Sequence, residues 1–225
     1  MDDILVRATG VSKRYGEGDA AVTSLRDLTF EIAPRAHLAI MGPSGSGKST
    51  MLQVIAGLID ATGGQIEWPA FGEKNQLRPT HIGITFQGPS LMAPLTVLEN
   101  VALPLLLLGT SEESAAAAAC QMIARFSLAE LAAKLPEEIS GGQAQRAGLA
   151  RALITRPRLV LADEPTGQQD RMGSRGVIDT LLAVAEGIDA SVVVATHDEE
   201  VAGRLDQRWS LVDGTLTTGG SSWMR

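Results

Sequence analysis

Apolar and polar positions alternate along the first part of the chain in a way that predicts short strands. The alternation in Leu25–Ile32 (LRDLTFEI) is typical of a strand with one buried face, and residues 1–36 together are predicted to form strands and turns. His37–Met41 (HLAIM) is a short apolar strand that leads directly into a glycine-rich turn. The apolar residues of Lys48–Leu58 then recur along one side of a predicted helix.

Two near-continuous apolar segments predict a buried parallel sheet in the second half of the chain. Leu159–Ala162 and Val192–Ala195 are apolar throughout, and a helical pattern over about Met172–Glu186 separates them. Gly83–Phe86 is a further predicted strand, and residues 89–156 have mainly helical periodicity. Apolar strands that alternate with helices are typical of a parallel sheet covered on both faces. The predicted fold class is therefore α/β with an inserted helical segment.

We expect the whole chain, residues 1–225, to form a single domain. Residues 1–88 and 157–225 would make up its α/β body, and residues 89–156 would form the helical subdomain. This division follows the change from strand patterns to helical patterns and back again.

The helical segment has two features that bear on its structure. Thr110 is the predicted N-cap of an alanine-rich helix, because Glu113 three residues later would complete a capping box. Val101–Leu108 (VALPLLLL) is the most apolar stretch, but it is far shorter than the about 20 residues needed to cross a bilayer. Any role at a membrane would therefore require a partner.

Composition and charge narrow the possible functions. The 225 residues carry a net charge of −7, and the sequence has no long run of Lys or Arg. We therefore expect no nucleic acid partner. The single cysteine, Cys120, excludes a disulfide framework and lies in a helical run, where it is either a small packed residue or a reactive thiol. The first ten residues, MDDILVRATG, lack the pattern of a signal peptide.

A phosphate-binding loop follows the apolar strand His37–Met41. GPSGSGKST matches the pattern G-x-x-x-x-G-K-[ST], with a strand before it and a helix after it, which favours a phosphate site over an ordinary glycine-rich loop. The glycines let backbone N–H groups point inward, Lys48 supplies a cation near the β- and γ-phosphates, and the Ser49 hydroxyl is placed for Mg²⁺. The predicted nucleotide contacts are Gly42, Pro43, Ser44, Gly45, Ser46, Gly47, Lys48, Ser49 and Thr50.

Polar side chains at the ends of three other strands complete the candidate site. The strand LVLADE ends in two carboxylates. Asp163 would hold Mg²⁺, and Glu164 would orient or deprotonate the attacking water. The alternative is that the pair is merely an exposed strand end. His197 would contact the γ-phosphate, although a lone histidine can also be structural. Gln87 could contact Mg²⁺ and the attacking water, but it is a weak signal by itself. Tyr15 could stack on adenine or simply pack on the fold.

Taken in chain order, Tyr15, GPSGSGKST, Gln87, ISGGQAQR, LVLADEP and His197 resemble the ATP-binding subunits of ABC transporters. The resemblance covers essentially the whole chain, and its most specific element is SGGQ between the phosphate loop and the strand with two carboxylates. It implies a P-loop NTPase fold with an N-terminal antiparallel β subdomain and an inserted helical subdomain. It also implies head-to-tail dimers in which Ser140, Gly141, Gly142 and Gln143 contact the ATP held by the partner, with Asp170 as a further contact.

The resemblance further implies a Mg²⁺-dependent ATPase that drives integral membrane permease subunits from the cytoplasmic face of the inner membrane. Leu95–Gly109 (LTVLENVALPLLLLG) is similar to the subgroup for lipoprotein release, macrolide export and cell division, although its leucines could instead pack inside the helical arm. Two alternatives stay open, namely an ATPase that regulates a membrane scaffold and a soluble ABC ATPase that acts on nucleic acid.

Three departures from the subgroup's pattern stand out. The signature begins with Ile139 where leucine is usual, and Gln168 and Gln169 precede Asp170 where asparagine and leucine are usual. The stretch Glu67–Thr80 is short for the subgroup, which weakens the substrate assignment rather than the ATPase assignment.

Overall fold

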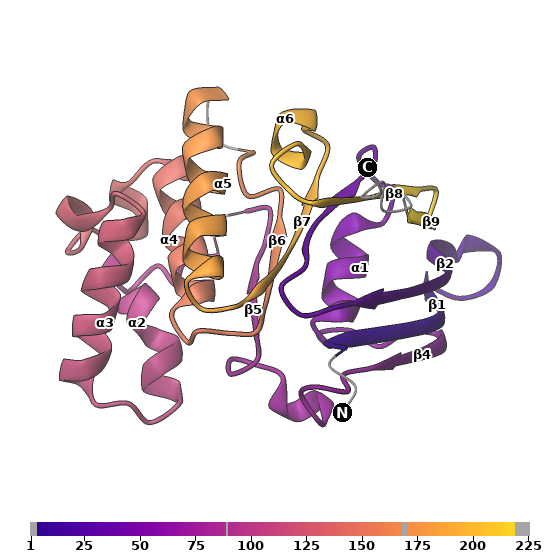
Figure 1. Ribbon diagram of the computed structural model, residues 1–225, viewed down its shortest axis with the longest axis horizontal. Helices are drawn as coiled ribbons and strands as arrows, with labels where there is room; N and C mark the ends of the chain where they lie inside the picture. The colour runs from indigo at the N-terminus through magenta and orange to yellow at the C-terminus, as the bar shows by residue number, and fades with distance from the viewer. Residues whose placement is uncertain (1–3, 89, 168–170, 219–225) are drawn as a thin grey trace, which may run out of the picture.

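The computed structural model describes residues 4–88, 90–167 and 171–218, which form two sheets with helices between and beside them (Figure 1). The smaller sheet is antiparallel, with the order β2-β1-β4. Its strands are β1 (Val6–Tyr15), β2 (Val22–Ile32) and β4 (Gly63–Glu67). Leu28, Phe30 and Ile32 alternate and bury one face of β2, as the sequence predicts. Leu25 is buried as well, beyond an irregularity at Asp27, whose φ is 52°.

The larger sheet has the order β5-β6-β7-β3-β8-β9 and is parallel except at β9, which runs antiparallel to β8. β6 and β7 lie near its centre and are buried along their whole lengths, as their continuous apolar sequences predict. The strands are β3 (His37–Met41), β5 (Ile82–Thr85), β6 (Leu159–Asp163), β7 (Ser191–Thr196), β8 (Gln207–Val212) and β9 (Thr215–Thr218).

Helices cover both faces of the larger sheet. On one face, Leu159 and Leu161 of β6 pack in a core with α1 and the antiparallel sheet, while on the other face Val160 and Ala162 pack in a core with α3, α4 and α5. Figure 1 shows α1 between the two sheets and α2, α3 and α4 together at the far end of the molecule. The helices are α1 (Lys48–Ile55), α2 (Val97–Leu107), α3 (Glu112–Arg125), α4 (Gly141–Leu153), α5 (Arg171–Glu186) and α6 (Glu199–Ala202).

The helical segment differs from its sequence prediction at the start of α3. The N-cap is Ser111, whose hydroxyl accepts from the backbone N–H of Ser114. The predicted N-cap Thr110 instead donates its backbone N–H to the carbonyl of Leu105, after Gly109 has turned the chain with a φ of 83°. Thr110 therefore belongs to the turn that closes α2.

Short 3₁₀ turns connect several of these elements, at Gly18–Ala20, Lys74–Gln76, Ala129–Leu131 and Pro136–Glu138. Across residues 4–88, 90–167 and 171–218, every helix is too short or too polar to cross a bilayer.

Candidate nucleotide-binding site

The carboxyl ends of β3, β5, β6 and β7 meet at one edge of the sheet, where an open cleft of about 550 Å³ lies. The parallel register aligns these ends, since Met41 lies opposite Thr196 and Asp163 lies opposite Ala195. This is the edge at which open α/β sheets bind ligands. The cleft is lined by Ser24, Pro43, Ser44, Gly45, Gly47, Lys48, Ser49, Thr50, Gln87, Asp163, Glu164 and His197.

The glycine-rich turn between β3 and α1 wraps so tightly that two of its glycines cannot carry a side chain. A Cβ on Gly42 would lie 2.1 Å from the carbonyl oxygen of Leu211. Gly47 has a φ of 104°, and a Cβ there would lie 2.5 Å from the carbonyl oxygen of Ser24. Gly47 is also the N-cap of α1 and provides no side-chain cap, so the first N–H groups of α1 are available to an anion.

Lys48 is the first residue of α1, and its almost fully buried side chain reaches back into this turn. Its Nζ donates to the carbonyls of Gly42 at 2.7 Å and Pro43 at 3.0 Å, and it lies 3.9 Å from Oε1 of Glu164. An ammonium group that is held by carbonyls and faces an open cleft can turn to an entering phosphate. The geometry therefore suits a bound polyphosphate.

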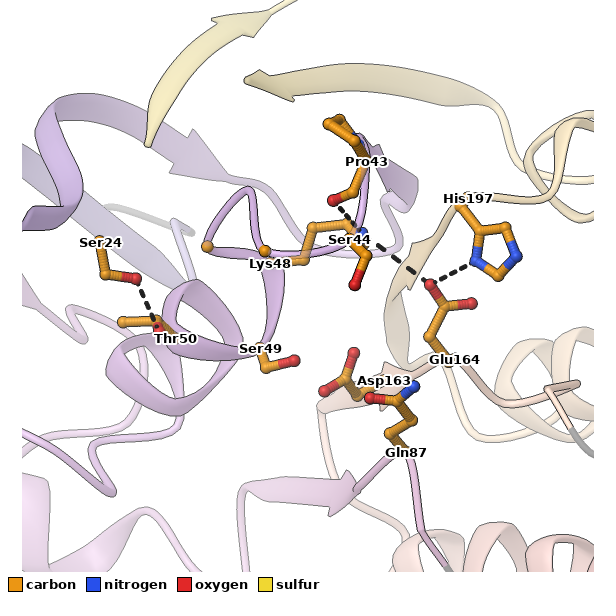
Figure 2. A pocket seen from close by; sticks show the side chains of 12 residues that line it. Ser24, Pro43, Ser44, Lys48, Ser49, Thr50, Gln87, Asp163, Glu164 and His197 are labelled. Carbon is orange, nitrogen blue, oxygen red and sulfur yellow. Dashed lines mark hydrogen bonds and ion pairs between the residues drawn. The ribbon is translucent and has the colours of Figure 1, made fainter. Parts of the chain in front are cut away.

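Glu164 is held from several sides although it follows the last residue of β6. Its side chain is 9% exposed, and its Oε1 lies 2.8 Å from Nδ1 of His197 (Figure 2). The hydroxyl of Thr196 lies 3.4 Å from Oε2. The backbone of Glu164 has a φ of 46°, a left-handed conformation that is costly for a residue with a side chain and is found often at functional sites.

Asp163 faces the Ser49 hydroxyl across the cleft, with the Gln87 side chain beside it (Figure 2). Asp163 is 5% exposed, and burial raises the pKa of its carboxyl above the ordinary value while the hydrogen bond from Ser49 opposes that shift. A hydroxyl, a carboxylate and an amide oxygen are the hard oxygen ligands that Mg²⁺ uses beside substrate phosphates. The residues present therefore fit a magnesium ion bound together with a nucleotide.

The sequence matches known proteins along almost its whole length. The family model described as ABC transporter matches residues 25–167. The chain belongs to the ABC transporter family. It is 37% identical over 223 residues to the lipoprotein-releasing system ATP-binding protein LolD of Legionella pneumophila strain Paris, covering 96% of this chain and 98% of the relative. It is 36% identical to the LolD protein of Novosphingobium aromaticivorans, covering 96% of this chain and 100% of the relative.

Solved structures agree with this assignment. A dimeric ATP-binding cassette in a post-hydrolysis state with ADP and Pi has a TM-score of 0.87 and 33% sequence identity, and the match covers 95% of this chain and 98% of that one. A Clostridium perfringens cassette, cbiO1, has a TM-score of 0.83 at 23% identity and supports the fold alone. The predictions of an ABC-type ATP-binding subunit, of its ATPase class and of its α/β fold are confirmed.

Most of the predicted residues of this ABC subunit come together in the cleft, but some do not. Gly42 and Ser46 of the phosphate loop are outside the lining; Ser46 is buried, and its hydroxyl has no partner within the described ranges. Tyr15 ends β1, is 43% exposed, and has the Lys13 ammonium 5.1 Å from its ring centre. Its contact with adenine stays a prediction. Asp170, with Gln168 and Gln169, lies outside the described residues.

Ser140–Gln143, which we call the SGGQ corner, starts α4 and does not line the cleft of its own chain. Ser140 and Gln143 form a reciprocal capping box. The Ser140 hydroxyl accepts from the Gln143 backbone N–H at 3.2 Å, and Gln143 Oε1 accepts from the Ser140 backbone N–H at 2.8 Å. The corner therefore has a fixed shape before any partner binds.

The sequence does not reveal two residues that shape the site. Ser24 of β2 lines the cleft and its hydroxyl donates to Thr50 Oγ1 at 2.9 Å, yet no motif near Ser24 indicates this. Gln145 follows the SGGQ corner in the sequence, and its amide donates to the backbone carbonyl of Glu164 at 2.6 Å. The burial of Gln145 is visible only in the structure, and the sequence around it does not indicate this contact.

Proposed function

We propose that two copies of this chain close around two ATP molecules, hydrolyse them with Mg²⁺, and drive a membrane partner that releases lipoproteins. The observation that carries this proposal is the arrangement in the cleft, where a phosphate loop faces a buried carboxylate pair at one sheet edge. One cleft therefore contains candidate groups for binding phosphate, binding Mg²⁺ and accepting a proton, and in the proposed dimer the partner's SGGQ corner would complete the site.

Each residue would have a distinct role in hydrolysis. The loop N–H groups and Lys48 would hold the β- and γ-phosphates, and Ser49, Asp163 and Gln87 would hold Mg²⁺, which neutralises charge on the phosphate oxygens when it is bound. Glu164 would accept a proton from the attacking water, because its carboxylate faces the cleft beside His197. His197 would then orient this carboxylate and contact the γ-phosphate.

The position of the SGGQ corner supports a dimer. The corner lies outside the cleft of its own chain, but its capped serine and the helix start at Gly141 suit an anion from another molecule. Contacts to the γ-phosphate would disappear on hydrolysis, so closure would follow the nucleotide state. The solved cassette with ADP and Pi is itself dimeric.

A membrane partner is proposed from the relatives and from one exposed surface. The relatives carry the name of a lipoprotein-releasing system, and the end of α2 exposes Leu106, Leu107 and Leu108, with Leu107 73% exposed. The helical subdomain, proposed as residues 89–156, would contact the permease there and position the chain at the cytoplasmic face of the inner membrane. The net charge of −7 argues against nucleic acid as the partner.

The test is reconstitution of the chain with the membrane protein that co-purifies with it. Vesicles that contain this complex and a labelled lipoprotein should release the lipoprotein on addition of Mg²⁺ and ATP, and a complex with Glu164→Gln should not. Hydrolysis without release would contradict the lipoprotein role and favour the alternative of an ATPase that regulates a membrane scaffold.

A further inference from the structure

Gln145 connects the helix of the SGGQ corner to the main chain of Glu164. Its Nε2 donates to the backbone oxygen of Glu164 at 2.6 Å, between α4 and the end of β6. The side chain is 2% exposed, so water does not compete for this contact. A hydrogen bond that is shielded from water is strong. Its loss would leave the Glu164 carbonyl without this donor.

The other end of the Gln145 amide is unusual. Its Oε1 is buried and has no hydrogen-bond partner within the described ranges. A glutamine that served only to stabilise the core would satisfy both ends of its amide. Among the described residues, the Gln145 amide makes its hydrogen bond through Nε2, and the acceptor belongs to the residue that the proposed function makes the general base.

The contact is one of three hydrogen bonds on the Glu164 backbone within the described ranges. Glu164 has a left-handed φ of 46°, and its N–H donates to Ala195 of β7 at 2.9 Å. Its carbonyl accepts from Gln145 and from the backbone N–H of Gly167 at 3.1 Å. The backbone of Glu164 is therefore held by β7 on one side and by α4 on the other, and it sets the position from which the carboxylate reaches His197 and Lys48.

Gln145 lies on the same rigid helix as the corner. It is five residues after Ser140, which places it about 7.5 Å along the axis of α4 from the N-cap. A movement of the start of α4 is transmitted to Gln145 because an α-helix shifts as a unit over so short a distance.

We propose that Gln145 is a positioning residue, which ties the direction of the Glu164 carboxylate to the position of α4. Hydrolysis in one site would thus respond to whether the same subunit's SGGQ corner is seated on its partner's nucleotide. This inference rests on the proposed function, and it adds a link between the two ATP sites through a single side chain.

The test uses Gln145→Met, which keeps the size of the side chain and removes the N–H donor. In the complex with the membrane partner, kcat for ATP should fall about ten- to a hundredfold while KM stays unchanged, because misdirection of a reacting group costs rate and not binding. Gln145→Leu removes the same donor without burying a charge, and it serves if the methionine variant does not fold. Leu149→Met, at a buried position one turn later on α4, should leave kcat unchanged.

A double variant separates positioning from a general structural effect. If Gln145 acts through Glu164, Gln145→Met should lower the small residual single-turnover rate of Glu164→Gln by less than twofold. A wild-type kcat in folded Gln145→Met would overturn the inference, and so would an equal fall in both backgrounds or a matching rise in KM. Failure of the proposed function appears separately, as full turnover in Glu164→Gln alone.

Discussion

The imidazole Nδ1 of His197 lies 2.8 Å from Oε1 of Glu164, across two neighbouring strand ends of the parallel sheet. The His197 side chain is 72% exposed, whereas that of Glu164 is 9% exposed. The histidine therefore lies over the cleft side of a carboxylate that is otherwise enclosed by protein. This relationship fixes the carboxylate at the place where an attacking water would have to lose its proton.

Replacement of Glu164 by glutamine should abolish turnover and leave ATP binding intact. The amide keeps the shape of the side chain but cannot accept a proton, so kcat should fall at least about a hundredfold. Phosphate release measures the first effect, and titration with a fluorescent ATP analogue measures the second. Wild-type turnover in this variant would reject Glu164 as the general base.

Replacement of Lys48 by alanine should weaken ATP binding about ten- to a hundredfold. A hydrogen bond to a charged group contributes roughly 1.5–3 kcal/mol, and the ammonium must exchange the carbonyls of Gly42 and Pro43 for phosphate oxygens. Isothermal titration with ATP measures the affinity. Lys74→Ala, which removes a lysine that pairs with Asp60 outside the cleft lining, is the control and should bind like the wild type.

Replacement of Asp163 by asparagine should stabilise the nucleotide-free chain. Burial raises the pKa of Asp163 above its value in the unfolded chain. The folded state therefore loses stability as pH rises from the pKa of the unfolded chain to that of the folded chain. The thermal midpoint of Asp163→Asn should therefore exceed that of the wild type near pH 7, and the difference should shrink near pH 4. The same variant should lose the additional stabilisation that Mg²⁺ gives in the presence of ATP. A midpoint below that of the wild type near pH 7 would contradict the electrostatic account.

Replacement of Ser140 by arginine should disable the site of the opposite subunit. In a mixed dimer of one Ser140→Arg subunit and one intact subunit, we expect loss of the site that uses the altered corner and no more than half of the normal turnover. Differently tagged subunits allow the mixed dimer to be isolated for a phosphate-release assay. Two fully active sites would reject contact across the dimer.

The main features of the fold could be predicted from the sequence because its signals are strong and local. The buried strands β6 and β7 contain the continuous apolar runs Leu159–Ala162 and Val192–Ala195. The phosphate-loop motif GPSGSGKST lies between a strand and a helix. The sequence predicts Thr110 rather than Ser111 as the N-cap of α3 because both residues can cap a helix, and only the turn at Gly109 decides between them.

Contacts between segments far apart in the sequence could not be predicted. Ser24 reaches the cleft because the antiparallel sheet packs beside α1, and Gln145 reaches Glu164 because α4 packs on the end of β6. For neither residue does the spacing of motifs or the adjacent sequence indicate its partner. Such contacts depend on tertiary packing, which a single sequence does not specify position by position.

The central claim is that two copies of the chain enclose nucleotide, and its most direct test is the mass of the Glu164→Gln variant in solution. With Mg²⁺ and ATP, sedimentation analysis of this variant with its membrane partner in detergent should show two copies of the chain per complex, and removal of ATP should reverse any dimer formed by the isolated chain. A single copy per complex, with ATP bound and hydrolysis blocked, would contradict the account.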